Sequence, residues 1–99
     1  MTIYALSSGS GISGVAVVRV SGKNTAKVLK LITNEDLPTP RVATLRKLNK
    51  IKTNELIDEA IVIWFPGPQS YTGEDLAEFH VHGSRAVIHA LHSTLSTVE

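Results

Sequence analysis

Hydrogen-bonding side chains gather in one segment of the chain, residues 66–83, directly beside an apolar strand. Glu74 and Asp75 are adjacent carboxylates there, and two like charges so close together can split their pKa values into those of a general acid and a general base. No nucleophile or metal partner lies near them in the sequence. We therefore interpret this pair, and Glu78 after it, as turn-forming or ligand-binding carboxylates rather than catalytic ones.

The four histidines raise the alternative of a metal site. His80 and His82 are two apart in a predicted strand, so both project from the same face. His89 and His92 are three apart in a predicted helix, opposite its apolar stripe, and are expected to face solvent. Zinc requires three or four converging ligands, and the chain has no cysteine. We predict no metal site, and we interpret His82 as a structural or ligand-facing hydrogen-bonding residue.

Arg19 and a glycine-rich loop are the other candidate binding features. Arg19 interrupts a β-branched run, so it either faces solvent on one side of a sheet or meets an anion. The loop from Gly9 to Gly14 has the G-x-G-x-x-G spacing of dinucleotide sites, but that motif must open a helix. Here it precedes a predicted strand, which favours a flexible hairpin connection.

The composition is that of an ordinary small globular domain. Of the 99 residues, 42% are hydrophobic and 19% are charged, and the net charge of +1 provides no broad attraction for nucleic acid. No apolar run is long enough to span a bilayer, and the N-terminus lacks a secretory signal, so a cytoplasmic location is expected. A local basic cluster is predicted to be a solvated edge or hairpin. It comprises Arg41, Arg46, Lys47, Lys50 and Lys52.

Hydrophobic periodicity predicts elements in the order β, β, α, β, β, β, α. The predicted strands are residues 2–6, 15–20, 42–48, 57–65 and 76–82, and the predicted helices begin after the capping residues Asn24 and Ser84. The strand 57–65 contains the run Ala60–Phe65, which is nearly all apolar and typical of a strand covered on both faces. The pattern predicts one α+β (mixed α/β) domain, with an approximately five-stranded sheet and two helices packed on it.

Four motifs, in order along nearly the whole chain, together resemble the N-terminal domain of the tRNA-modification GTPase family MnmE, also called TrmE. They are Val17-Val18-Arg19-Val20-Ser21-Gly22, Phe65-Pro66-Gly67-Pro68, Ser70-Tyr71-Thr72-Gly73-Glu74-Asp75, and Glu78 through His82-Gly83. The resemblance implies that residues 1–99 form a homodimerising domain similar to tetrahydrofolate-binding domains, with 5-formyl-tetrahydrofolate or a related reduced folate as the cofactor. Carried over position by position, the implied folate-binding residues are Arg19, Tyr71, Thr72, Gly73, Glu74 and Glu78.

The resemblance also implies that this domain is part of a larger, multidomain protein. In the family, a helical domain and a G domain follow, and the protein acts with the FAD-dependent partner MnmG on carbon 5 of the wobble uridine (U34) of certain tRNAs. GTP, magnesium and potassium belong to the G domain. This chain contains no G-x-x-x-x-G-K-[ST] P-loop, so it is predicted to be a binding module with no catalytic residue. Ile12 stands where the family has a loop arginine; the alternative is therefore a scaffold that only dimerises, with a degraded folate pocket.

Overall fold

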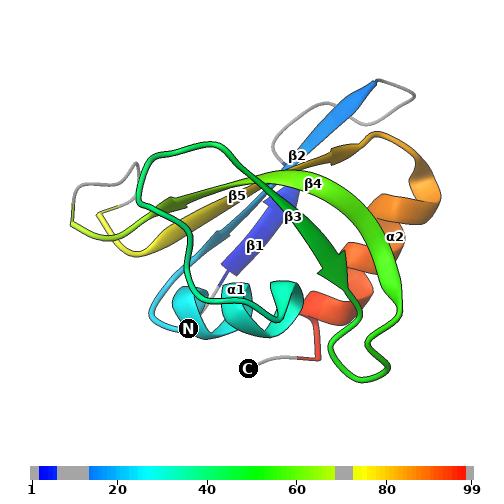
Figure 1. Cartoon of the computed structure of the whole chain (residues 1–99), viewed down its shortest axis with the longest axis horizontal. Coiled ribbons are helices and arrows are strands. Elements are labelled where there is room, and N and C mark those ends of the chain that lie inside the picture. The colour runs from blue at the N-terminus through cyan, green and yellow to red at the C-terminus, as the bar shows by residue number, and fades with distance from the viewer. Residues whose placement is uncertain (1–2, 7–13, 69–72, 98–99) are drawn as a thin grey trace.

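A computed structural model of the chain describes residues 3–6, 14–68 and 73–97, and the side chains from residue 14 onward within these ranges. Two helices lie on one side of an antiparallel sheet (Figure 1). The strands are β1 (Ile3–Leu6), β2 (Val15–Ser21), β3 (Thr44–Asn49), β4 (Leu56–Phe65) and β5 (Leu76–His82). The helices are α1 (Thr25–Thr33) and α2 (Arg85–Leu95). The predicted α+β class, with five strands and two helices, is confirmed.

The sheet has the strand order β1-β2-β5-β4-β3, and every neighbouring pair is antiparallel. The C-terminal strand β5 therefore lies in the middle, between β2 and β4. In this register Arg19 is directly opposite Glu78, and His80 lies between Val17 and Ile61. β3 is an edge strand. The basic cluster lies on or beside β3 and in the turn that follows it, as predicted for an edge or hairpin.

The core lies between the sheet and the helices. On β2 and β5, every second side chain points toward the helices and is buried, including Val18, Val20 and Phe79. This alternation follows from the two-residue period of a strand. α1 and α2 cover these side chains with the stripes expected from their spacing. The buried stripe residues are Val28, Leu29 and Ile32 of α1 and Leu91 and Leu95 of α2.

The two helix starts are built differently. The Ser84 hydroxyl accepts a hydrogen bond from the Val87 N–H at 3.1 Å, which confirms the predicted cap of α2. Asn24 occupies the N-cap position of α1, but its side chain makes no capping hydrogen bond, contrary to prediction. The buried hydroxyl of Thr25 instead donates to the Gly22 carbonyl at 2.8 Å and so fixes the first turn from inside.

Two predictions about solvent contact are wrong. β4 is covered on one face only, and its side chains alternate, so that Ile61 is 36% exposed while Val62 is fully buried. The reason is that both helices pack on the same face of the sheet. Similarly, His89 is exposed as predicted, but His92 is half-buried.

No helix in the described ranges is long and apolar enough to cross a membrane.

Candidate functional site

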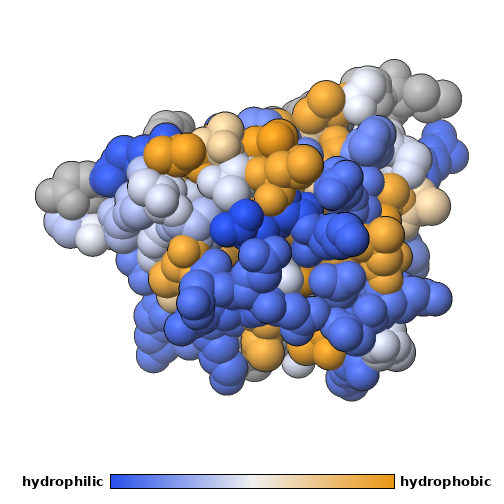
Figure 2. All heavy atoms as spheres, viewed as in Figure 1, coloured by the Kyte–Doolittle hydropathy of each residue, from blue (hydrophilic) through white to orange (hydrophobic). Residues whose placement is uncertain are grey.

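The sheet face away from the helices, here called the open face, carries charged side chains within an apolar surround. It includes the following outward-pointing residues of four strands: Val15, Val17 and Arg19 of β2, Leu45 and Lys47 of β3, Glu59, Ile61 and Ile63 of β4, and Glu78, His80 and His82 of β5. On the upper side of the molecule, which is the side of the sheet away from the helices, hydrophobic and hydrophilic residues are interspersed (Figure 2). Such a mixed surface suits a binding role.

Glu78 is the centre of the charged cluster. Arg19 Nε–H donates to Glu78 Oε2 at 2.8 Å from the neighbouring strand, and His80 Nε2 lies 3.0 Å from Glu78 Oε1. An ionised carboxylate only accepts hydrogen bonds, so His80 Nε2 must carry the proton. The Glu78 side chain is 14% exposed, against 43% for Arg19 and 31% for His80. Glu78, the least exposed of the three side chains, is therefore the one with a hydrogen-bond partner at each of its two carboxylate oxygens.

The pKa of Glu78 reflects opposing effects. Burial raises the pKa of this carboxyl, but the hydrogen bonds and the charges of Arg19 and His80 together lower it more, so that the pKa lies below its usual value. Glu78 is consequently ionised at neutral pH. A half-buried carboxylate fixed in this way can accept hydrogen bonds from ring N–H and amino groups of a ligand, and Arg19 can meet an acidic group.

Glu74 and Gly73 line a separate shallow hollow of about 380 Å³, together with Lys23, Gly67, Pro68 and Asp75. Asp75 accepts a hydrogen bond from the Gly67 N–H at 2.9 Å, so this carboxylate closes the loop, as the turn-forming interpretation predicts. A Cβ at Gly67 would lie 2.9 Å from the backbone carbon of Glu74. Glycine is required there because the two ends of the loop touch.

The predicted site residues thus fall into two groups. Arg19 and Glu78 are in contact, while Gly73 and Glu74 lie earlier along the chain in the hollow. Glu74 and Glu78 are four positions apart in the sequence, so their Cα atoms are at most about 14 Å apart. Tyr71 and Thr72 lie outside the described residues, as does Ile12.

The sequence reasoning missed His80 as a partner of Glu78 and Asp58 as a partner of His82. His82 Nδ1 lies 2.8 and 3.0 Å from the two carboxylate oxygens of Asp58, and the His82 backbone N–H donates to the same carboxylate at 2.9 Å. This arrangement confirms that His82 is a hydrogen-bonding residue, which links the end of β5 to Asp58 of β4. The two-residue spacing of Glu78, His80 and His82 in a strand indicates that the three side chains share one face of the sheet, and this spacing could have predicted the contact between Glu78 and His80. Among the described residues, no group of three or more potential ligands could hold a metal.

The fold places the chain in the class of small antiparallel α+β domains, here with a charged cluster on an uncovered sheet face. Comparison with known proteins identifies the family within this class. The family model described as "GTP-binding protein TrmE N-terminus" matches residues 2–98, so the chain belongs to this family.

Curated relatives agree with this family assignment. The chain is 71% identical over its whole length to a tRNA modification GTPase MnmE from Pelagibacter ubique (strain HTCC1062), of which it covers 22%. It is 50% identical, over 98% of its length, to the human mitochondrial 5-taurinomethyluridine-[tRNA] synthase subunit GTPB3, of which it covers 20%. It thus spans about a fifth of the length of these relatives.

Proposed function

We propose that this chain is the folate-binding and homodimerising N-terminal module of a tRNA-modification GTPase. The observation that carries the proposal is the Arg19–Glu78–His80 cluster on the open face. A reduced pterin presents ring N–H and amino donors on one edge, and Glu78 is a fixed, ionised acceptor for them. Arg19 donates to Glu78 Oε2 at 2.8 Å and so holds this acceptor in position.

The separation of the two groups of predicted residues is compatible with one elongated ligand. A folate joins a flat pterin to a long acidic tail, and the distance between Glu74 and Glu78 is within its reach. Tyr71 offers an aromatic face for stacking on the pterin, and Thr72 offers a hydroxyl; both remain predictions.

Exposed apolar side chains on the open face support the proposal of a homodimer. Val15 and Leu45 are 55% and 56% exposed and Ile61 is 36% exposed, around the charged cluster. A second copy that covers these side chains would remove apolar surface from water and would also desolvate Glu78 and its partners, which strengthens their hydrogen bonds to a ligand.

We propose that a longer protein containing this domain modifies tRNA and hydrolyses GTP, as the names of its relatives indicate. The cytoplasmic location stays a prediction from the sequence. MnmG, potassium and the wobble uridine enter this proposal through the family resemblance. The domain itself contributes binding and assembly, not the chemical step.

Calorimetric titration of the chain with 5-formyl-tetrahydrofolate tests the folate site. We expect binding, and we expect Glu78→Gln to weaken it roughly 10- to 100-fold, which corresponds to one charge-assisted hydrogen bond. Asp36→Asn is the control, because Asp36 is an exposed carboxylate in a loop outside the open face. Equal affinities for the wild type and the Glu78→Gln variant would contradict the assigned site.

The scaffold alternative is favoured by Ile12, which replaces a family arginine. Sedimentation analysis shows whether the chain is a dimer, and calorimetric titration of the same sample with folate separates the scaffold from the folate proposal. A folded dimer that releases no heat with folate would establish the scaffold. Leu45→Glu should shift the equilibrium toward monomer, whereas Leu31→Glu, at an exposed position of α1, should not.

A further inference from the structure

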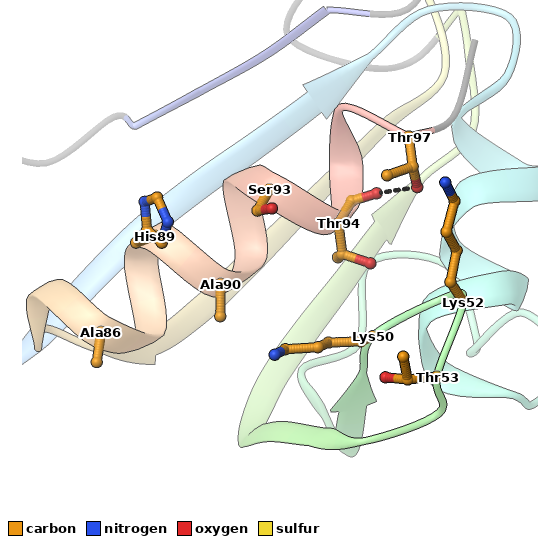
Figure 3. Close-up of a pocket in the computed structure, with 9 residues that line it drawn as sticks. All are labelled: Lys50, Lys52, Thr53, Ala86, His89, Ala90, Ser93, Thr94 and Thr97. Carbon is orange, nitrogen blue, oxygen red and sulfur yellow. Dashed lines mark hydrogen bonds between the residues drawn. The ribbon is translucent and has the colours of Figure 1, made fainter.

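A second hollow lies on the helix side of the molecule, between α2 and the turn that joins β3 to β4 (Figure 3). Its volume is about 450 Å³, and it shares no lining residue with the open face. It is lined by Lys50, Lys52, Thr53, Ala86, His89, Ala90, Ser93, Thr94 and Thr97. The small side chains Ala86 and Ala90 on α2 leave the space open.

Seven of the nine residues that line this hollow have polar side chains, although apolar atoms form most of its surface, and no carboxylate is among the lining residues. The side chains of Lys52, His89 and Ser93 make no hydrogen bond or ion pair with any other residue in the described part of the chain. Lys50 pairs with Glu55 at 2.8 Å, and both side chains are well exposed, at 42% and 66%. Because an exposed ion pair of this kind contributes little to stability, a phosphate group can displace Glu55 from Lys50.

The hollow is held in shape by backbone hydrogen bonds rather than by its charged side chains. The Ile51 N–H donates to the Thr94 hydroxyl at 2.8 Å and so ties the turn to α2. Within the turn, the Lys50 N–H donates to the Glu55 carbonyl at 2.8 Å and the Asn54 N–H to the Lys50 carbonyl at 2.7 Å. The lysines are thus presented from a fixed platform, which limits the entropy lost on binding.

We propose that this hollow binds phosphate groups of an RNA backbone. In Figure 3, the Lys50 side chain runs along α2 beneath Ala90, whereas that of Lys52 rises toward Thr97. The two ammonium groups point to different parts of the hollow, an arrangement that fits successive phosphates better than a single anion. The hydroxyl and imidazole donors add neutral contacts of the kind that position a nucleic acid without reading its sequence.

The net charge limits the affinity. With +1 on the whole chain and the negative end of the α2 dipole near Thr97, the two lysines supply the attraction alone. Non-specific binding with a Kd of about 10⁻⁴ M follows. This subsite is independent of the folate proposal, and it is suited to an auxiliary contact with an RNA that other parts of a longer protein hold more tightly.

Fluorescence anisotropy of a labelled RNA hairpin, with the full 99-residue chain at 50 and 200 mM KCl, tests the proposal. Each phosphate contact contributes a slope of about 0.9 in the plot of log K against log salt. Two contacts give about a 12-fold loss of affinity over this fourfold range, and one contact gives about a 3.5-fold loss. The wild type is therefore expected to show the 12-fold loss and Lys52→Gln the 3.5-fold loss. Lys27→Gln, an exposed lysine of α1 outside the hollow, should retain the wild-type salt dependence.

Two further arms separate a specific subsite from general electrostatics and from free phosphate. Glu55→Gln should tighten RNA binding because it releases Lys50, whereas Asp36→Asn, with the same charge change outside the hollow, should tighten it less. Equal effects of Lys52→Gln and Lys27→Gln, or of the two acid variants, would overturn the proposal. So would amide shifts at Lys52 and Ser93 caused by inorganic phosphate but not by RNA. An unchanged thermal midpoint shows that each variant is folded.

Discussion

Replacing Glu78 with glutamine tests whether the Arg19–Glu78–His80 cluster has the electrostatics inferred for it. Glutamine retains the shape of the side chain but removes the charge between the two donors, at 2.8 and 3.0 Å. Hydrogen bonds to a charged group contribute about 1.5–3 kcal/mol, and the exposure of Arg19 reduces this through solvent screening. We expect Glu78→Gln to lower the free energy of unfolding by about 1 kcal/mol at pH 7, which is about 4–8 °C in Tm for a domain of this size.

The pH dependence of the stability difference between the wild type and Glu78→Gln tests the electrostatic account more directly than its size at one pH. The pKa of Glu78 is lower in the folded chain than in the unfolded chain, so its stabilising contribution is complete above the unfolded value. The contribution disappears as the pH falls through the folded value, because protonated Glu78 then resembles glutamine.

Urea denaturation of both proteins between pH 7 and pH 3 should therefore show a stability difference that shrinks toward acid. Asp36→Asn, at an exposed loop position, is the control and should show a small difference. A Glu78→Gln variant as stable as the wild type at pH 7, or a difference independent of pH, would refute the electrostatic account.

Three further substitutions test the packing that positions the sites, each measured by urea denaturation. Gly67→Ala should destabilise by about 1–3 kcal/mol because its Cβ meets the Glu74 backbone, whereas Gly14→Ala, with no atom within 4 Å, should stay within about 0.5 kcal/mol of wild type. Thr94→Val should cost about 1–3 kcal/mol, since the Ile51 N–H loses its acceptor; a neutral result would show that the turn is not tied to α2. Phe79→Ala, fully buried at the centre of β5, should cost about 3–5 kcal/mol, and a loss below 1 kcal/mol would contradict the assigned core.

Much of the fold was predictable because its signals are local. The strand period on β2 and the capping serine before α2 depend only on neighbouring residues. The strand order was not predictable, because β5 pairs with β2 although the partners Arg19 and Glu78 are 59 positions apart in the sequence. From the sequence, Arg19 was predicted either to face solvent or to meet an anion. Its partner in the structure is Glu78, a carboxylate that the sequence reasoning had assigned separately to ligand binding.

The error on β4 has a different physical cause. A run of apolar residues shows that burial is favourable but not which face a helix covers. Because α1 and α2 both pack on one face, Ile61 and Ile63 remain on the other. Adjacent carboxylates show the same limit: Asp75 accepts a backbone N–H and closes the loop, while Glu74 beside it is exposed, and only the loop conformation distinguishes them.

The composition of the open face bears on the choice between a folate site and a scaffold. Burying charges at an interface costs desolvation energy, and apolar residues of similar volume often stabilise such an interface equally well or better. A surface that served dimerisation alone would therefore gain little from Arg19, Glu78 and His80 at its centre. Here Glu78 is held ionised in a half-buried position, with donors on both sides and exposed apolar residues around it. That arrangement suits the recognition of a polar ligand with both donor and acidic groups, and this is why we favour the folate site over the scaffold.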